Sequence, residues 1–291
     1  MKGLKIIVLA KQVPDTRNVG KDAMKANGTV NRGALPAIFN PEDLKALEQA
    51  LQLKDKYPGT TVTILTMGPG RAADIVREGL FRGADNGYLI TDRKFAGSDT
   101  LATSYEISLA AKKLAPFDLI LCGRQAIDGD TAQVGPQVAE KINIPQVTYA
   151  EMIDKVDKGK ITIKRRLERG VETVEAPMPL LVTVHGSAPD CRSRNAKFLL
   201  KYKHAETWTE KQRDTEDYIK LHEDRPYLDI AEWTVDDLKA DETYLGLTGS
   251  PTKVKRVFNV VFTAKEAKVL NESDSDIEEL MKELIDNHNI G

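Results

Sequence analysis

The sequence contains few cysteines and little imbalance of charge. Its 291 residues include two cysteines, Cys122 and Cys191, which lie far apart along the chain. Two distant cysteines provide neither a disulfide framework nor a Cys-ligated zinc site, so we expect a reducing, cytoplasmic environment. The formal net charge of −2 at pH 7 gives no electrostatic basis for binding nucleic acid.

Long apolar runs are also lacking. The sequence contains no stretch of about 18 apolar residues, which is the length that a membrane-spanning helix needs. The apolar run near the N-terminus is short, Lys11 interrupts it, and no small-residue cleavage site follows, so we expect a strand there and not a signal peptide. The four histidines are scattered, and no Ser-His-Asp or Cys-His group is evident, so we expect no side-chain nucleophile.

In the first half of the chain, short apolar runs alternate with segments of helical periodicity. A capping signature, with Asn40 as N-cap, Pro41 at the first helical position and the acidic Asp43 in the first turn, begins one of the helices. Such alternation predicts an α/β fold with βαβ units, a parallel sheet and right-handed crossovers. The expected strands are 5–10, 61–67, 87–91 and 117–122, and the expected helices are 41–56, 71–82, 98–114 and 133–142.

After Pro145 the rhythm changes. Residues 160–167 and 171–174 predict a β-hairpin, and residues 180–184 predict one more buried strand. Four basic residues gather on this hairpin, which indicates either a solvated surface or a contact with a flavin, a phosphate or an acidic partner. They are Lys164, Arg165, Arg166 and Arg169.

From His185 onward the βαβ rhythm is lost. A strand is expected at 254–262, and the apolar spacing of 274–289 predicts an amphipathic helix. This part has too thin a hydrophobic pattern to form a domain by itself. We therefore divide the chain into an α/β domain, residues 1–190, and an extended C-terminal arm, residues 191–291, which we expect to lie along another chain.

The loop that follows Gly123 links an expected strand to the helix expected at 133–142. Gly123 ends the strand, because glycine accepts the backbone angles that a sharp exit needs. The first N–H groups of a helix have no partner within it, and the helix dipole is positive there, so the place favours a phosphate. Small residues at Gly129, Ala132 and Gly135 would let an anion approach the main chain.

Residue types alone leave alternatives open for this loop. Asp128 and Thr131 are also common turn and cap residues. The loop lacks the lysine of a P-loop and the G-x-G-x-x-G spacing. Asp128 and Asp130 together could also indicate a magnesium site, although no other acids cluster with them.

Ligands of parallel α/β sheets bind beyond the carboxyl ends of the strands. This rule brings four segments to one rim, namely residues 9–15, 67–70, 91–100 and 123–136, and the helix start at 40–43 joins them. Several loops on one rim suit an elongated ligand such as a dinucleotide.

Five motifs, in this order along the chain, resemble the β subunit of electron transfer flavoproteins. They are KQVPDT at 11–16, FNPED at 39–43, TMGP at 66–69, GRQAIDGDTAQVGP at 123–136 and RRLERGVET at 165–173, with a weaker match in GSPTKV at 249–254. The resemblance implies a Rossmann-like (adenine nucleotide alpha hydrolase-like) parallel sheet with a β-hairpin addition and a long C-terminal arm. It also implies a heterodimer with an α subunit.

The family has two branches that differ in the nucleotide of this subunit. In the ordinary branch it is a structural AMP, and in the electron-bifurcating branch it is a second FAD that accepts hydride from NADH. Residues 13–16 and 91–104 resemble the bifurcating branch. This branch implies that one electron goes through the α-subunit FAD to an acyl-CoA dehydrogenase or similar flavin dehydrogenase. The other electron goes to ferredoxin or flavodoxin.

Two alternatives remain open: an ordinary electron carrier with AMP, and a nucleotide-sensing domain like the universal stress proteins. In the family, the segment after the last sheet strand recognises the partner dehydrogenase through an apolar anchor and lysines. Residues 188–204 have the lysines but carry arginine and asparagine where the anchor is expected. The identity of the dehydrogenase is therefore open.

The resemblance also implies a set of cofactor-binding residues. Those expected to line the adenosine and pyrophosphate are Leu9, Asn40, Pro41, Glu42, Asp43, Met67, Gly68, Arg124, Gln125, Ala126, Asp128, Gly129, Asp130, Thr131, Ala132, Gln133, Val134, Gly135 and Pro136. Those expected nearer the isoalloxazine ring are Phe95, Ala96, Gly97, Asp99, Thr100 and Arg165.

Overall fold

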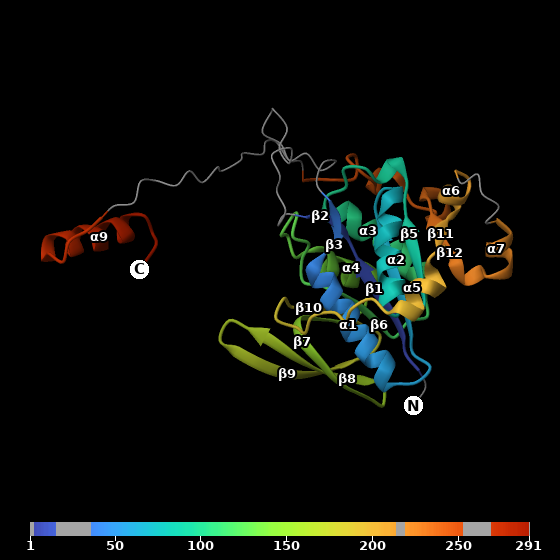
Figure 1. The fold of residues 1–291 in the computed structure, drawn as a ribbon, viewed down its shortest axis with the longest axis horizontal. Helices are drawn as coiled ribbons and strands as arrows, with labels where there is room; N and C mark the ends of the chain where they lie inside the picture. The colour runs from blue at the N-terminus through green and yellow to red at the C-terminus, as the bar shows by residue number, and fades with distance from the viewer. Residues whose placement is uncertain (1–2, 16–35, 214–218, 253–268, 291) are drawn as a thin grey trace.

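The computed structural model describes residues 3–15, 36–213, 219–252 and 269–290. A ten-stranded sheet runs through the molecule in the order β11-β12-β5-β4-β1-β6-β10-β7-β8-β9 (Figure 1). Its central strands are parallel, as the alternating pattern predicts. These strands are β1 (Lys5–Ala10), β4 (Thr61–Met67), β5 (Asn86–Ile90), β6 (Leu119–Gly123) and β10 (Leu180–Val184).

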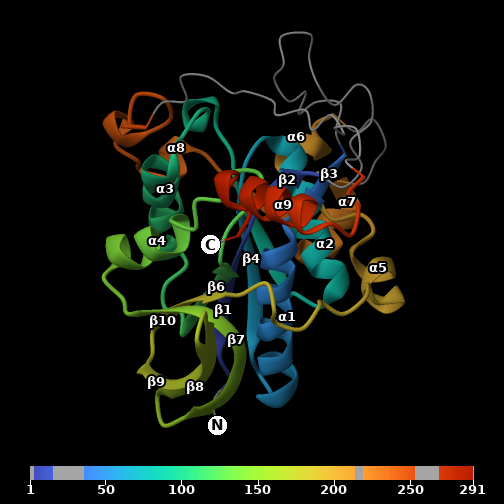
Figure 2. The same ribbon diagram turned by 90° about the vertical axis from the view of Figure 1, so that its left-hand side faces the viewer.

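Two helices cover each face of the central sheet, and Figure 2 shows the two pairs on opposite sides of the strands. Ile6 and Val8 of β1 pack into one core and Ile7 and Leu9 into the other, because successive side chains of a strand point to opposite faces. One core includes residues of α1 (Pro41–Lys56) and α2 (Ala73–Arg82), and the other includes residues of α3 (Thr100–Lys113) and α4 (Val134–Ile142). These observations confirm the Rossmann-like fold class.

The expected hairpin is present as β8 (Lys160–Leu167) and β9 (Gly170–Pro177). Before it comes β7 (Gln146–Asp157), a strand that the sequence did not predict. Its first residues pair in parallel with β10, and its later ones pair antiparallel with β8. The register shifts at Tyr149, whose φ of 59° is left-handed, so a bulge bends the strand out of the parallel sheet.

Part of the C-terminal segment completes the sheet, which was not expected for an extended arm beginning at residue 191. Strand β12 (Asp229–Trp233) pairs in parallel with β5, and β11 (Glu206–Thr207) pairs with β12. Both strands are short, so they give little periodicity to detect. The helices of this segment are α5 (Ala196–Tyr202), α6 (Trp208–Lys211), α7 (Ile219–Asp224) and α8 (Val235–Leu238).

The expected C-terminal helix is α9 (Asp274–Asp286), which has no buried residue and lies apart from the sheet (Figure 1). The strand expected at 254–262 lies outside the described residues. The two short strands β2 (Gln12–Pro14) and β3 (Ala37–Phe39) pair antiparallel above the carboxyl end of β1. In the described part of the chain, no helix has the length and apolar character needed to cross a bilayer.

Candidate functional site

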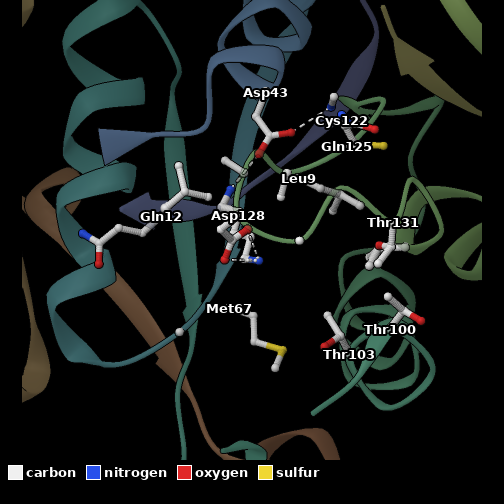
Figure 3. A pocket seen from close by; sticks show the side chains of 18 of the residues that line it. Leu9, Gln12, Asp43, Met67, Thr100, Thr103, Cys122, Gln125, Asp128 and Thr131 are labelled. Carbon is white, nitrogen blue, oxygen red and sulfur yellow. Dashed lines mark hydrogen bonds and ion pairs between the residues drawn. The ribbon is translucent and has the colours of Figure 1, made fainter. Parts of the chain in front are cut away.

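A cavity of about 520 Å³ lies at the carboxyl ends of the parallel strands. It opens beside β1 and β6. The direction in which strands are added to the sheet reverses here, because β4 and β5 follow outward from β1 on one side and β10 follows outward from β6 on the other. Such a switch point is the usual ligand site of an open α/β sheet. Figure 3 shows Asp43 and Asp128 on one side of this cavity and Thr100, Thr103 and Thr131 on another.

The structure brings most of the predicted cofactor-binding residues together at this cavity. Its lining includes Leu9, Asp43, Met67, Gly68, Phe95, Gly97, Asp99, Thr100, Arg124, Gln125, Ala126, Asp128, Gly129, Asp130, Thr131, Ala132, Gln133, Val134 and Gly135. The predicted residues that do not line it are Asn40, Pro41, Glu42, Ala96, Pro136 and Arg165.

Asn40 and Glu42 hold the loop that begins at Arg124. The Asn40 amide donates to the Gln125 carbonyl at 2.9 Å and accepts from the Ile127 N–H at 3.2 Å, and it makes no side-chain cap bond to its own helix. The Glu42 carboxylate accepts from the Gln125 N–H at 3.1 Å and pairs with Arg124 at 3.0 Å. Both residues therefore shape the cavity from behind the loop.

Asp43 joins three elements beneath the cavity. Its carboxylate accepts from the backbone N–H of Lys11 at 2.9 Å and from that of Gly123 at 2.8 Å, so α1 is tied to the ends of β1 and β6. Burial raises the pKa of Asp43 to about 7, and the two N–H donors oppose that rise. Asp43 thus links β1 and β6 beyond their last paired residues, Val8 and Leu121, at the switch point.

Gly123 is needed for close approach, and not for the unusual backbone angles expected from the sequence. Its φ is not in the left-handed region, and a Cβ there would lie 2.6 Å from Asp43 Oδ1. Gly135 plays a similar part, because a Cβ there would lie 2.9 Å from Cys122 Sγ. Its small size therefore serves packing of α4 on the sheet, whereas the position of a Cβ on Gly129 faces open space.

Lys11 supplies the lysine that the loop itself lacks. Its Nζ lies 2.7 Å from Oδ1 and 3.0 Å from Oδ2 of Asp128, and both residues line the cavity. Sequence reasoning sought a lysine within the loop and did not single out Lys11. Lys11 could have been predicted as a lining residue from its position directly after a buried strand, at the rim of the sheet. Other lining residues absent from the predicted set are Ala10, Gln12, Val13, Pro14, Ala37, Leu65, Pro69, Arg71, Ser98, Thr103, Ile107, Cys122 and Gly123.

The loop before α4 has a defined shape. Asp130 and Ala132 adopt left-handed φ angles of 49° and 52°, and the Gln125 amide donates to Asp130 Oδ1 at 2.8 Å. Non-glycine residues in this region are uncommon and often lie at functional sites. Asp128 pairs with Lys11 and Asp130 with Gln125, so the two carboxylates do not converge on a magnesium position. Among the described residues, no group of three or more potential metal ligands occurs.

The starts of α3 and α4 meet at the cavity. Thr100 begins α3 and donates its hydroxyl to the side chain of Gln133, the N-cap of α4, at 2.8 Å. At the start of α3 the Asp99 carboxylate already accepts from the N–H groups of Leu101 and Ala102. Gln133 makes no side-chain cap bond, so the start of α4 is the helix end that favours an anion. Apolar side chains form other parts of the wall, and these are Leu9, Leu65, Met67, Phe95, Ile107 and Val134.

Arg165 is engaged in the hairpin. Its guanidinium donates to the Thr148 carbonyl at 2.6 Å and to the Thr148 hydroxyl at 2.9 Å, and it pairs with Glu172 at 2.5 Å. These bonds place it outside the cavity of this chain. A position beside an isoalloxazine ring in an assembled protein remains a prediction.

Comparison with known proteins agrees with the geometry. The electron transfer flavoprotein domain family matches residues 27–207. An electron transfer flavoprotein subunit beta of Megasphaera elsdenii is 45% identical over 261 residues, which is 88% of this chain and 87% of the relative.

Two further relatives carry names that point to larger complexes. The subunit CarD of the caffeyl-CoA reductase-Etf complex of Acetobacterium woodii is 40% identical over 88% of each chain. The acryloyl-CoA reductase electron transfer subunit gamma of Anaerotignum propionicum is 53% identical over 62% of this chain and 67% of the relative. The chain therefore belongs to the electron transfer flavoprotein family, with β subunits among its relatives.

Proposed function

We propose that this chain is the β subunit of a bifurcating electron transfer flavoprotein and that its cavity holds FAD. The carrying observation is the cavity at the switch point, where the starts of α3 and α4 and the Lys11 ammonium meet. Electron transfer flavoprotein β subunits work as heterodimers with an α subunit. The proposed assembly is therefore such a heterodimer.

The residues present suit an adenine dinucleotide. The start of α4, where Gln133 makes no side-chain cap bond, provides backbone N–H donors for a diphosphate, and Lys11 adds a charged donor. Leu9, Met67 and Val134 provide apolar surface for an aromatic ring, and Thr131 offers a hydroxyl for a sugar or phosphate oxygen. The cavity is also within the usual size range of cofactor sites, which is roughly 300 to 1,000 Å³.

The work of this chain is binding and electrostatic tuning. A bound FAD would supply the chemistry for accepting hydride from NADH and for delivering single electrons. One electron would go to the α-subunit FAD with its acyl-CoA dehydrogenase-type acceptor, and the other would go to ferredoxin or flavodoxin. The loop after Gly123 would hold the diphosphate, and residues 95–100 would border the ring system. Nearby charges, among them Lys11, Asp99 and Arg124, would tune its potential.

The names of two relatives support the bifurcating branch. The relative from Acetobacterium woodii is named as a subunit of a caffeyl-CoA reductase-Etf complex, and the relative from Anaerotignum propionicum as an electron transfer subunit of acryloyl-CoA reductase. An ordinary electron carrier with AMP in the cavity is the alternative. Membership of the flavoprotein family argues against the nucleotide-sensing alternative.

The test is nucleotide analysis of the chain co-expressed with its α subunit. We expect two FAD per heterodimer and bleaching of the flavin absorbance by NADH. One FAD with one AMP and no reaction with NADH would assign the chain to the ordinary branch. Absence of any nucleotide beyond the α-subunit FAD would refute the cavity assignment.

A pair of variants locates the second nucleotide. Met67→Trp adds bulk to a cavity-lining residue, so we expect it to lower nucleotide content to about one FAD per heterodimer. Met152→Trp places the same bulk on an exposed residue of β7 and should keep the full content. Equal nucleotide content in the two variants would show that the second FAD binds elsewhere.

A further inference from the structure

Residues 241–252 lie beside the start of α3 (Figure 2), and two of them bond to Asp99, a residue of the cavity wall. The Asp99 N–H donates to the Ser250 hydroxyl at 2.8 Å, and the Thr252 N–H donates to Asp99 Oδ2 at 2.9 Å. Lys94 pairs with Glu242 at 2.5 Å. Since Asp99 also lines the cavity, the wall has the proposed nucleotide on one side and the C-terminal segment on the other.

Glu106 joins these two sides. It lies on α3 and is fully buried, with 0% exposure. Its Oε1 accepts from the Gly246 N–H at 3.4 Å and lies 2.9 Å from the Ser98 hydroxyl, whose one proton is shared between Glu106 and the Phe95 carbonyl at 2.8 Å. Ser98 lines the cavity. The Oε2 of Glu106 is buried and has no hydrogen-bond partner in the described part of the chain.

A buried carboxyl with one unsatisfied oxygen is costly when it is ionised. Burial raises the pKa of Glu106 to about 7, the negative Asp99 adds to that rise, and the Ser98 and Gly246 donors oppose it. Asp99 is the charged side chain that acts on Glu106, and residues 245–252, which pack beside it, contain no ionisable side chain. Both protonation states are therefore populated near neutral pH.

We propose that Glu106 is a positioning residue that couples nucleotide binding in the cavity to proton uptake and to a weaker hold on residues 246–252. The proposal rests on the proposed function, because its ligand is an anionic dinucleotide. An anion beside Ser98 disfavours the ionised carboxylate, so binding favours the protonated form. The ionised carboxylate is the stronger acceptor for the Gly246 N–H, so protonation weakens the contact with the C-terminal segment. Nucleotide binding and docking of this segment therefore oppose each other.

The first test measures the affinity of the heterodimer for the second equivalent of FAD, whose diphosphate does not titrate between pH 6.5 and pH 8. Because the bound state holds the proton more tightly, the Kd should rise as pH rises above about 7, by at most about tenfold per pH unit for one proton. Glu106→Gln keeps the shape of the protonated side chain, so its Kd should change little with pH. Glu140→Gln, an exposed residue of α4, is the matched control and should keep the wild-type pH dependence.

The second test needs no nucleotide in the cavity. Amide hydrogen exchange of residues 246–252, corrected for intrinsic rates, should show more protection at pH 8 than at pH 6.5 in the wild-type heterodimer. Glu106→Gln should show low protection at both values, and Glu140→Gln should follow the wild type. A purely structural role for Glu106 would lower protection in the Gln variant while the wild type shows no response to pH.

The two tests separate the possible failures. A heterodimer that binds no second FAD refutes the proposed function, while the exchange experiment still judges the contact between Glu106 and Gly246. A Gln variant with the wild-type pH response in both tests overturns the role of Glu106. Where the Gln variant does not fold, Ser98→Ala tests the same path. In this variant the hydrogen-exchange protection of residues 246–252 should still depend on pH, whereas the Kd for FAD should depend on pH less than in the wild type.

Discussion

Lys11 Nζ lies 2.7 Å from Asp128 Oδ1 and joins the end of β1 to the loop before α4. The Lys11 side chain is half exposed, so the pair contributes little to stability, about 0 to 1 kcal/mol. Its position at the cavity matters more, because a charge-assisted hydrogen bond to a phosphate is worth about 1.5 to 3 kcal/mol.

We therefore expect Lys11→Met to weaken FAD binding at the second site by at least about tenfold while the midpoint of urea unfolding changes little. Titration of the heterodimer with FAD measures the first quantity. Lys112→Met, an exposed residue of α3, is the control and should bind FAD as the wild type does. Unchanged affinity in Lys11→Met would exclude this residue from the diphosphate site.

Asp43 should make stability depend on pH. Its pKa is raised to about 7 in the folded chain, against an ordinary value of about 4 in the unfolded chain, so the folded state binds more protons between these values. Stability from this group therefore falls as pH rises from about 4 to about 7, and it is constant above. Asp43→Asn cannot titrate, so the free energy of unfolding of the wild type, relative to this variant, should decrease over that range.

Urea unfolding at several pH values, with the same heterodimer preparation, measures this difference. The amide in Asp43→Asn has one acceptor oxygen for the two N–H groups of Lys11 and Gly123, so the variant should be less stable than the wild type at pH 5. A difference that does not vary with pH would mean that Asp43 stays ionised throughout.

The central sheet could be predicted from the sequence because its strands are buried on both faces and read as apolar runs. Residues 5–10, 61–67 and 180–184 were placed with the observed bounds. Strand β7 was missed because a bulge at Tyr149 breaks its alternation, so no single period extends along it. Strands β11 and β12 have few residues, and their place at the sheet edge depends on tertiary pairing with β5.

At the candidate site, the loop and its place on the rim could be predicted because both follow from a strand end and a helix start. The contacts of Asn40 and Glu42 could not, since they link α1 to residues more than 80 positions away in the sequence. The same is true of Lys11 and Asp128, which are 117 positions apart. Such pairs depend on which strands become neighbours, and local patterns carry no information about that.

Gly123, at the end of β6, and Gly129, in the loop that follows, should respond differently to a methyl group. In Gly123→Ala the new Cβ would lie 2.6 Å from Asp43 Oδ1 and 2.8 Å from Asp43 N, so a backbone shift is required. We expect a loss of about 1 to 3 kcal/mol in the free energy of unfolding. Gly129→Ala meets nothing within 4 Å and needs no left-handed φ, so it should cost little. Comparable losses in the two variants would show that α1 does not approach β6 this closely.

Helix α9 should contribute to the contact with the α subunit. Its apolar residues Ile277, Met281 and Ile285 are 44% to 53% exposed in this chain, although their spacing places them on one side of the helix. Complete burial of a fully exposed side chain of this kind is worth about 1.5 to 3 kcal/mol, and these half-exposed side chains would gain about half of that each. Met281→Asp should therefore raise the dissociation constant of the heterodimer by at least about tenfold, as measured by sedimentation at several concentrations. Lys282→Asp introduces the same carboxylate outside the apolar side and should dissociate as the wild type does. Equal dissociation constants for both variants and the wild type would mean that α9 does not lie on the α subunit, and that the heterodimer is held by other surfaces of the chain.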